Sequence, residues 1–331
     1  MNLHFTSGDC NGIGLECFAK ALPIANNFLQ QNSISCSLAI HPQTLQEYCM
    51  QLSIPFTLSD SVLHLGDVAI EIVDCSEYSP VMFGNETEEA GALAKQSLER
   101  SVDAVLAKQF DALVTLPVSK HALYLAGWQF PGQTEMINHR CGSSNPLMIL
   151  CNDTVRVALV TIHIPLSQVA NNISQMAITA KVEQFQQSLI SDFGIKNPRI
   201  ALLGLNPHAG EHGTIGTEEE TIIRPAIVEL QQNGIDAYGP FPADGFFAFG
   251  EYKPYDGILA MYHDQGLIPL KLLANGGGVN VTGNVSVIRT SPDHGTGFGI
   301  AGKGIADPQS TVEAIKTAFQ IYKNRQQANS L

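Results

Sequence analysis

The chain has 331 residues, of which 44% are hydrophobic and only 15% charged, and its formal net charge is −13. Two lobes are the natural expectation at this length, and so little charge suggests that a partner subunit covers part of the surface. The acidic balance argues against nucleic acid or an anionic membrane as a partner. An anionic metabolite would need a local cluster of basic side chains.

Seven cysteines are spread along the chain without a CxxC pair. The odd count argues against a disulfide framework and for a reducing compartment. The N-terminus lacks the basic-then-apolar pattern of a signal peptide, and no uninterrupted apolar run is long enough to span a bilayer. We therefore expect a soluble, cytoplasmic protein.

The predicted elements alternate between strands and helices. Strands are expected at 3–6, 36–40, 68–73, 111–116, 147–151, 155–161, 199–205, 258–261, 279–281 and 285–289. Helices are expected from about residue 15, after Pro42, from Thr87 to about 109, near Met136, at about 179–193, after Thr217 and at about 308–328. This alternation predicts a mainly parallel α/β protein.

The most informative stretch is the short apolar run at 258–261, which has the pattern of a buried parallel strand. Directly after it come His263, Asp264 and Gln265. Ligands in open α/β sheets bind just outside the carboxyl ends of strands, so this group has the chemistry of a site. The simpler interpretation is a capped strand end whose polar side chains bond only to nearby backbone.

Three histidines, His163, His208 and His263, stand at the ends of three separate predicted strands. One alone is more often a core or loop residue than a ligand. Because strands of one sheet end at a common edge, three in this position are better explained as neighbours. Neutral imidazoles suit zinc, cobalt, nickel, manganese or iron(II), and three protein ligands leave coordination positions open for a substrate. His212 is not assigned, because nearby glycines disfavour a helix joining it to His208.

Four further side chains are candidate donors to a phosphate or carboxylate: Thr134, Lys271, Asn280 and Arg289. Arginine suits bidentate anion binding and lysine supplies a point charge. Each would otherwise be an ordinary surface residue. Their predicted position near the same sheet edge favours a substrate site.

Several long motifs resemble the 4-hydroxythreonine-4-phosphate dehydrogenase (PdxA) family. They are "GLNPHAGE", "PADGFF", "ILAMYHDQGL" and "RTSPDHGT", together with the spacing of Lys271, Asn280 and Arg289. The likeness runs from "SGDCNGIG" near the N-terminus to the end of the chain. The segment from His294 to Pro308 also resembles the adenosine-binding loop of isopropylmalate dehydrogenases, which share the fold of this family.

The resemblance implies two α/β/α lobes with a mostly parallel sheet and an active-site cleft between them, as in isopropylmalate dehydrogenase. We expect a cofactor-side domain from 1–125 plus 276–331, and a metal, substrate and dimerisation domain at 126–275. The resemblance also implies a homodimer whose two chains both supply residues to each active site.

The resemblance assigns roles residue by residue. It implies one divalent ion (Zn, Mg, Mn or Co) on residues matching His163, His208 and His263. The implied substrate-binding residues are Gln133, Thr134, Lys271, Asn280 and Arg289. NAD, or NADP, would lie along His294, Gly295, Thr296 and Asp307. The implied catalytic residues are Lys271, Asp244 and His263, and either Lys271 or Asp244 would take the hydroxyl proton.

The implied reaction is oxidation by NAD(P) of the C3 hydroxyl of 4-phosphohydroxy-L-threonine. The resulting β-keto acid decarboxylates to 3-amino-2-oxopropyl phosphate, a step of pyridoxal phosphate biosynthesis. The alternatives are a dehydrogenase of a 4-phosphorylated threonate or erythronate, and a homologue that binds a phosphometabolite without redox activity. Phosphate acyl transfer on a related fold ranks last, because it has no evident use for three histidines.

The chain departs from the family pattern at several positions. Gln133 stands where the family carries histidine, and glutamine cannot bring a positive charge to a phosphate. Leu116 replaces a glycine found in many members. Gly299 stands where related adenosine loops carry an acidic residue, which would bond the ribose hydroxyls and exclude a 2′-phosphate. These departures affect two expectations: the exact substrate, and the choice of NAD or NADP as cofactor.

Overall fold

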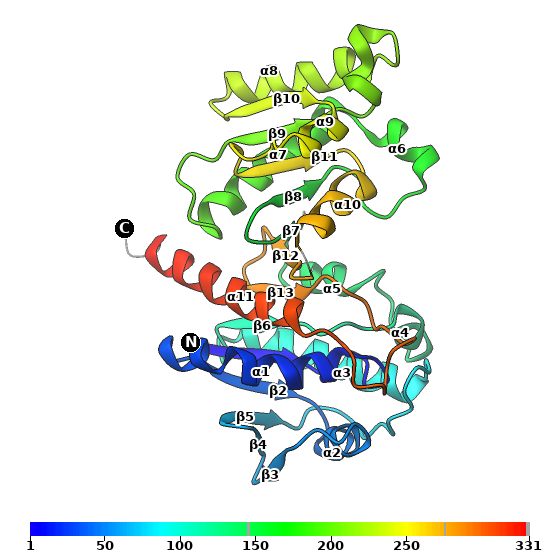
Figure 1. Ribbon diagram of the computed structural model, residues 1–331, viewed down its shortest axis with the longest axis vertical. Helices are drawn as coiled ribbons and strands as arrows, with labels where there is room; N and C mark the ends of the chain where they lie inside the picture. The colour runs from blue at the N-terminus through cyan, green and yellow to red at the C-terminus, as the bar shows by residue number, and fades with distance from the viewer. Residues whose placement is uncertain (144–145, 275, 329–331) are drawn as a thin grey trace. The chain divides into compact units, whose positions relative to one another are not determined.

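The computed structural model describes residues 1–143, 146–274 and 276–328 (Figure 1). The chain forms two compact units: Met1–Pro146 with Val285–Tyr322, and Leu147–Asn284 with Lys323–Leu331. The expected domain boundaries were 125/126 and 275/276, and the second falls at Asn275, outside the described residues. In the structure, the helix carrying Gln133 belongs to unit 1 and the strand carrying Asn280 to unit 2.

Unit 1 contains a sheet whose strands follow the order β13-β6-β1-β2-β5-β4-β3. The strands are β1 (Asn2–Thr6), β2 (Ser35–Ala39), β3 (Thr57–Ser59), β4 (Val62–Leu65), β5 (Val68–Val73), β6 (Ala112–Val114) and β13 (Arg289–Pro292). Its helices are α1 (Gly14–Gln31), α2 (Pro42–Gln51), α3 (Glu88–Leu106), α4 (Lys120–Leu125), α5 (Gln133–Arg140) and most of α11 (Gln309–Ala328). The pairs β1–β2, β1–β6, β2–β5 and β6–β13 are parallel.

Local sequence explains most of these elements. The central strands β1 and β6 are buried on both faces, as expected where helices cover a parallel sheet. Helix α3 begins as predicted, because the Thr87 hydroxyl accepts a hydrogen bond from Ala90 N at 3.2 Å. The strand predicted at 285–289 is wrong: the strand begins only at Arg289, and Val285 and Val287 pack instead into an apolar cluster beneath α3 and α5.

Unit 2 has the strand order β10-β9-β11-β8-β7-β12. Its strands are β7 (Leu147–Cys151), β8 (Arg156–Leu159), β9 (Ile200–Leu203), β10 (Ala237–Phe241), β11 (Gly257–Ala260) and β12 (Val279–Gly283). The four strands from β10 to β8 are parallel, whereas β7 runs antiparallel to β8 and β12. The other elements are α6 (Leu166–Asn172), α7 (Gln175–Ser191), η1 (Pro207–Gly213), η2 (Glu219–Ile223), α8 (Arg224–Gln232), α9 (Ala243–Ala248) and α10 (His263–Ala274).

The core of unit 2 follows the two-residue period of its strands. Alternate residues of β8, β9 and β11 pack with side chains of α9 and α10 in one apolar cluster. Helix α7 covers the opposite face, where Phe185 lies against Gly257 of β11 (Figure 1). Helix α10 was not predicted; it begins at His263 and contains Pro269. A Cβ at Gly266 would lie 2.7 Å from Val157 Cγ1, so α10 can approach β8 closely because glycine stands there.

Two other sequence expectations need correction. Thr217 does not cap the next helix: a π-helical turn begins at Glu219, and α8 follows at Arg224. Strands β3, β4 and β10 were not predicted, being short or interrupted by glycine and proline. In the described part of the chain, no helix is long and apolar enough to cross a membrane.

Candidate active site

Hydrogen bonds join the carboxyl ends of four parallel strands in unit 2. The Thr161 hydroxyl, after β8, donates to Met261 O, after β11, at 2.7 Å. The Gln265 amide oxygen accepts from Met261 N at 2.7 Å, and its Nε2 donates to Gly204 O, after β9, at 2.6 Å. Gly204 N in turn donates to Phe241 O at the end of β10. The segments that carry the predicted site residues of these strands are therefore fixed to one another.

Two of the three predicted metal ligands lie together at this edge. The ring centres of His163 and His263 are 5.7 Å apart, with 41° between the ring planes. Two imidazoles bound to one ion at about 2.1 Å would have ring centres roughly 5 to 6 Å apart, so the pair fits a shared divalent cation. His263 Nδ1 lies 2.7 Å from Asp264 Oδ1. A carboxylate on one ring nitrogen orients a ligating histidine and directs the other nitrogen to the metal.

The third predicted ligand, His208, lies in the turn η1 after β9 and is exposed. From His208 to His212 every residue has a positive φ, so the backbone forms a left-handed turn. Among the residues that the structure describes, no three His, Cys, Asp or Glu side chains form a group able to hold a metal ion. The structure thus brings His163 and His263 together but does not add His208 to them within one chain.

The other predicted residues of unit 2 are spread over three elements. Asp244 is exposed in the first turn of α9, after β10. Lys271 is exposed near the end of α10, the helix that begins with His263. Asn280 lies on β12, and its Oδ1 is shielded from solvent without a hydrogen-bond partner in the described structure. A buried amide oxygen without a partner is costly, which suggests that a ligand supplies the missing donor.

In unit 1 the guanidinium of Arg289 is buried. Arg289 is only 3% exposed, and its Nε and Nη2 donate to the Thr115 hydroxyl at 2.9 and 2.6 Å. Its Nη2 also lies 3.3 Å from Gln133 Oε1, while Gln133 Nε2 donates to Leu116 O at 3.1 Å. Burial lowers the pKa of Arg289 to about 10, and nearby Glu135 acts in the opposite direction. A guanidinium held in this way can bind an anion.

Gln133, predicted to bind substrate directly, therefore uses both ends of its amide within the protein. It is the first residue of α5, and Thr134 is the second. The first backbone N–H groups of a helix have no partner inside the helix, so this end of α5 can also donate to an anion. The structure places Gln133, Thr134 and Arg289 in one unit, whereas the expected boundaries put Gln133 and Thr134 in the metal and substrate domain and Arg289 in the cofactor-side domain. Within this unit Gln133 supports Arg289.

The predicted cofactor residues lie on one loop of unit 1 that packs on the N-terminal glycine loop. Thr296 O accepts from Ile13 N at 2.8 Å. His294 Nδ1 bonds to Gly295 O at 2.9 Å, and its Nε2 is shielded without a partner in the described structure. Asp307 Oδ1 accepts from Gln309 N at 2.9 Å, so this carboxylate caps the start of α11. Asp307 therefore stabilises the start of α11, in addition to its predicted role in binding the cofactor.

Three residues that contact predicted site residues or their segments were assigned no individual role from the sequence: Thr115 in unit 1, and Gln265 and Glu219 in unit 2. Thr115 supports Arg289, Gln265 joins the ends of β11 and β9, and Glu219 lies beneath the turn that carries His208. For Gln265 the sequence contained a signal, since it adjoins His263 and Asp264. The partner of Thr115, Arg289, lies far along the chain. The partner of Glu219, Asn206, is separated from it by a turn that was not predicted.

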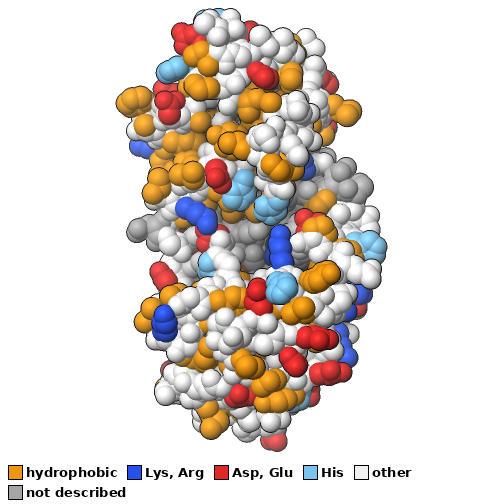
Figure 2. Space-filling view, turned by 90° about the vertical axis from the view of Figure 1, so that its right-hand side faces the viewer, with side chains coloured by type: hydrophobic (Ala, Val, Ile, Leu, Met, Phe, Trp, Pro, Cys, Tyr) orange, Lys and Arg blue, Asp and Glu red, His pale blue; other side chains and the backbone are white. Residues whose placement is uncertain are grey.

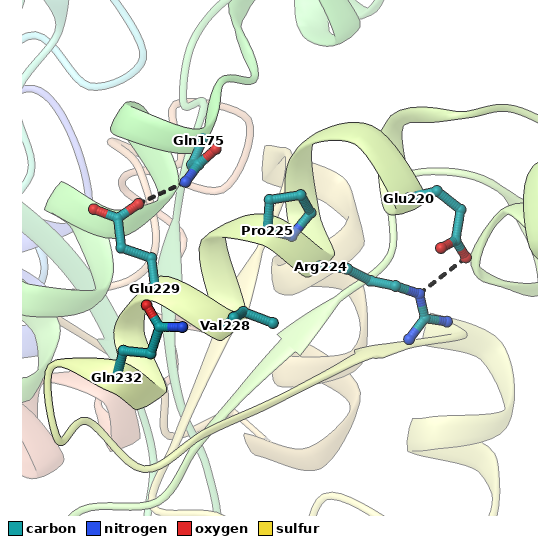
Figure 3. A pocket seen from close by; sticks show the side chains of 7 residues that line it. All are labelled: Gln175, Glu220, Arg224, Pro225, Val228, Glu229 and Gln232. Atoms are coloured by element: carbon teal, nitrogen blue, oxygen red, sulfur yellow. Dashed lines mark hydrogen bonds and ion pairs between the residues drawn. The ribbon is translucent and has the colours of Figure 1, made fainter.

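A shallow groove elsewhere in unit 2 contains none of the predicted site residues. Its walls are Gln175, Glu220, Arg224, Pro225, Val228, Glu229 and Gln232 (Figure 3). Polar side chains of the groove bond to each other: Arg224 Nε pairs with Glu220 Oε1 at 2.9 Å, and Gln175 Nε2 donates to Glu229 Oε2 at 2.6 Å (Figure 3). This groove is therefore a surface feature of α8 and not the candidate active site.

Comparisons with known proteins identify the family and the fold of this chain. A family model described as "Pyridoxal phosphate biosynthetic protein PdxA" matches residues 26–318. A 4-hydroxythreonine-4-phosphate dehydrogenase of Bacteroides thetaiotaomicron is 41% identical over 333 residues, covering 98% of this chain and 90% of that protein. The crystal structure of a 4-hydroxythreonine-4-phosphate dehydrogenase from Klebsiella pneumoniae superposes with a TM-score of 0.81 at 33% identity, covering 97% of this chain and 99% of that one.

Isocitrate dehydrogenase from Methylococcus capsulatus, at 12% identity and a TM-score of 0.50 over 99% of this chain and 87% of that one, shares the fold alone. The predicted fold class and the predicted family are confirmed. The chain belongs to the PdxA family of pyridoxal phosphate biosynthetic proteins.

Proposed function

We propose that this protein is an NAD(P)- and metal-dependent 4-hydroxythreonine-4-phosphate dehydrogenase. It oxidises the C3 hydroxyl of 4-phosphohydroxy-L-threonine to a β-keto acid, which decarboxylates to 3-amino-2-oxopropyl phosphate. Relatives that cover nearly the whole chain carry this activity in their names. The observation that carries the proposal is the His163–His263 pair with Asp264 bonded to one of its rings.

His163, His208 and His263 are the proposed metal ligands. Both paired imidazoles lie at strand ends fixed by the Thr161 and Gln265 hydrogen bonds, so the pair is preorganised for a cation. A divalent ion held there would supply Lewis-acid stabilisation of negative charge on the substrate, and NAD(P) would supply the hydride acceptor. Zn, Mn, Co and Mg are the candidate ions; imidazole ligands favour the transition metals.

Other side chains bind and orient the substrate. Arg289 pairs with the phosphate, aided by the N-terminal amides of α5 at Thr134. The unpartnered Oδ1 of Asn280 accepts a hydrogen bond from a substrate N–H or O–H group. Gln133 holds Arg289 in place.

Lys271 and Asp244 are the two groups proposed to move the hydroxyl proton. Both are exposed side chains of unit 2 and can therefore exchange protons with solvent. Lys271→Met and Asp244→Asn, each profiled for kcat against pH, separate the two assignments. Only the variant that lacks the base is expected to lose the limb of the kcat–pH profile that depends on that base.

A homodimer completes the proposed enzyme. Large apolar side chains are exposed on the segments that follow the paired histidines: Leu166 is 72% exposed, Ile268 58% and Leu272 79%. Figure 2 shows hydrophobic side chains on this face of unit 2 close to histidine side chains. Burying these side chains against a second copy would be favourable. A second copy would also account for a metal ligand set that one chain does not assemble.

The proposed location is the cytoplasm. Each of the seven cysteines, all of which the structure describes, is a free thiol. Burial raises the pKa of the Cys151 thiol to about 12, and that of Cys36 to about 12 as well. Such thiols are unreactive and fit a protein kept in a reducing compartment.

We propose that Gly299 and Lys303 determine whether the enzyme prefers NAD or NADP. Gly299 lacks the carboxylate that would exclude a 2′-phosphate, and Lys303 Nζ lies 2.8 Å from Gly299 O. A lysine beside that position favours the extra phosphate of NADP. The enzyme is therefore expected to accept NADP as well as NAD.

One observation favours a second candidate, oxidation of a 4-phosphorylated sugar acid such as threonate or erythronate. Gln133 is neutral and is already bonded to Arg289 and Leu116, so the charge balance around the substrate differs from that of a site with histidine. Gln133 is therefore the position at which recognition of a different 4-phosphorylated acid is expected to arise. The chemistry and the metal would be the same.

The test has two parts. Formation of NADH and NADPH is measured on 4-phosphohydroxy-L-threonine, 4-phosphothreonate and 4-phosphoerythronate, with and without Mn²⁺. The highest kcat/KM is expected on the amino acid and only with metal. A preference for a sugar acid would establish the second candidate, and turnover on none of them would refute both and leave a redox-inactive binding protein.

Metal content of variants forms the second part. His163→Ala and His263→Ala are expected to lose bound Mn²⁺, whereas His121→Ala, a surface histidine of α4, keeps it. Metal retained at wild-type affinity in both paired-histidine variants would refute the metal site.

A further inference from the structure

The backbone of the turn that carries His208 is held in a conformation that L residues disfavour. Five consecutive residues, from His208 to His212, have φ between 44° and 80°, and only Gly210 among them is glycine. A left-handed residue other than glycine costs roughly 1–2 kcal/mol. A turn of this kind persists only when its surroundings fix it.

Glu219 supplies that fixation from beneath the turn. Its side chain is fully buried, with 0% exposure. Its Oε1 accepts from the backbone N–H groups of Leu205 and Asn206, each at 2.7 Å, and its Oε2 accepts from Asn206 Nδ2 at 2.9 Å. One carboxylate therefore anchors the two residues that lead from β9 into the turn. Hydrogen bonds to an ionised acceptor are the stronger kind.

The same carboxylate also lies against the middle of the turn. A Cβ at Gly210 would be 2.5 Å from Glu219 Oε2, and Gly210 has a φ of 80°. Glycine at this position allows the backbone to fold over the carboxylate. Glu219 thus contacts the turn on both sides of His208 in sequence.

The anchored segment is linked to the paired histidines. Gly204, directly before it, accepts a hydrogen bond from Gln265, which follows His263 by two residues in α10. The base of the turn and the start of α10 are therefore tied together. A change at Glu219 would therefore alter how the turn presents His208 from unit 2.

We propose that Glu219 is a positioning residue of the metal site, whose carboxylate holds the left-handed turn so that His208 is presented as a metal ligand. The proposal rests on the proposed function, because it needs His208 to be a ligand. Glu219 touches neither the substrate nor the metal; it acts through the backbone of the turn.

The experiment compares Glu219→Gln with Glu220→Gln. Glutamine keeps the shape of Glu219 but replaces one acceptor oxygen by an NH₂ group, which would face the donors of Asn206. Glu220 is the residue after Glu219 in the π-helical turn η2. Its side chain is exposed and pairs with Arg224 at the surface. It is the matched control for loss of one charge at this place in the chain.

The readout is Mn²⁺ affinity of the full-length apoprotein by calorimetry, together with the visible spectrum of the Co²⁺ form. Loss of a residue that orients a ligand costs about 10- to 100-fold in metal affinity. Glu219→Gln is expected to raise the Mn²⁺ Kd by about tenfold or more and to change the Co²⁺ spectrum, while Glu220→Gln stays within about twofold of wild type. A purely structural role would lower the unfolding temperature of Glu219→Gln without changing either metal readout, and that result overturns the proposal.

A double-mutant cycle with His208→Ala shows whether the effect passes through His208. Glu219→Gln is expected to add nothing to the Mn²⁺ Kd of His208→Ala; full additivity overturns the proposal. If His208→Ala itself binds Mn²⁺ like wild type, the assignment of His208 fails and the inference falls with it. If His208→Ala binds weakly and Glu219→Gln binds normally, only the inference fails.

Asn206→Ala serves if Glu219→Gln does not fold. It removes the Nδ2 contact and leaves both backbone bonds to the carboxylate. A smaller rise in the Mn²⁺ Kd, in the same direction, supports the proposal, and an unchanged Kd overturns it.

Discussion

Removing the hydroxyl group that supports Arg289 should weaken both unit 1 and the binding of phosphate. Thr115 is fully buried, and its Oγ1 accepts two hydrogen bonds from the Arg289 guanidinium, at 2.9 and 2.6 Å. Thr115→Val keeps the branched shape and deletes this acceptor. Burial already lowers the pKa of Arg289 to about 10, so the charge is costly to keep in place.

The magnitude follows from the kind of bond lost. Hydrogen bonds to charged groups contribute about 1.5–3 kcal/mol, and a buried donor left without a partner costs a similar amount. Thr115→Val should therefore lower the unfolding free energy by about 2–3 kcal/mol, which corresponds to roughly 4–12 °C in Tm for a unit of this size. A displaced guanidinium should also raise KM for the phosphorylated substrate about tenfold, which equals about 1.4 kcal/mol.

The assay combines urea unfolding with steady-state kinetics and with calorimetry of inorganic phosphate binding. Thr290→Val on β13 is the matched control, because its buried hydroxyl donates to a neutral partner, Ala314 O at 2.9 Å. It should cost about 1 kcal/mol of stability and leave KM unchanged. Wild-type KM and wild-type phosphate affinity in Thr115→Val would refute the assignment of Arg289 as the phosphate ligand.

Three other variants test separate parts of the structure. Burial raises the pKa of Asp9 to about 6 from 3.8, so its folded-state carboxyl binds a proton more tightly and wild-type stability falls as pH rises from about 4 through 6. Asp9→Asn should remove this loss and be up to about 3 kcal/mol more stable than wild type at pH 7.5 but not at pH 4, by urea unfolding; a pH-independent difference would contradict this. Gly266→Ala should cost about 1–3 kcal/mol and weaken Mn²⁺ binding, because its Cβ would press α10 off β8 and move His263. Gly299→Asp meets open space, so it should fold normally and raise the kcat/KM ratio of NAD to NADP at least about tenfold; an unchanged ratio would exclude Gly299 from the cofactor site.

The sequence predicted most elements because their local signals and their tertiary surroundings agree. The apolar run of β5 matches its predicted bounds, and the Thr87 cap sets the start of α3 as expected. The predicted strand ends after β8 and β11 put His163 and His263 at one edge of the sheet, and their ring centres lie 5.7 Å apart, because parallel strands in one sheet end at one edge. The motif resemblance identified the family, since its motifs are long and cover nearly the whole chain.

Other features could not be predicted because they depend on contacts between distant residues. Helix α10 begins only two residues after β11 and contains Pro269, so its local signals indicated an ending. The left-handed turn at His208 depends on Glu219, which the sequence places in a separate helix start. Gln133 was predicted to contact substrate, but its partner Arg289 stands far along the chain, and only folding shows that the two side chains bond to each other.

The sequence by itself determined the fold class, the family and the residue types that the chemistry needs, because periodicity and long motifs consist of residues that are close together in the sequence. Tertiary structure alone decided which of these residues meet and how each is oriented. It brought His163 beside His263, gave Arg289 its neutral supports and set the backbone of the His208 turn. The physical reason is that hydrogen bonds and burial act between groups that are close in space, and distance along the chain does not encode that closeness.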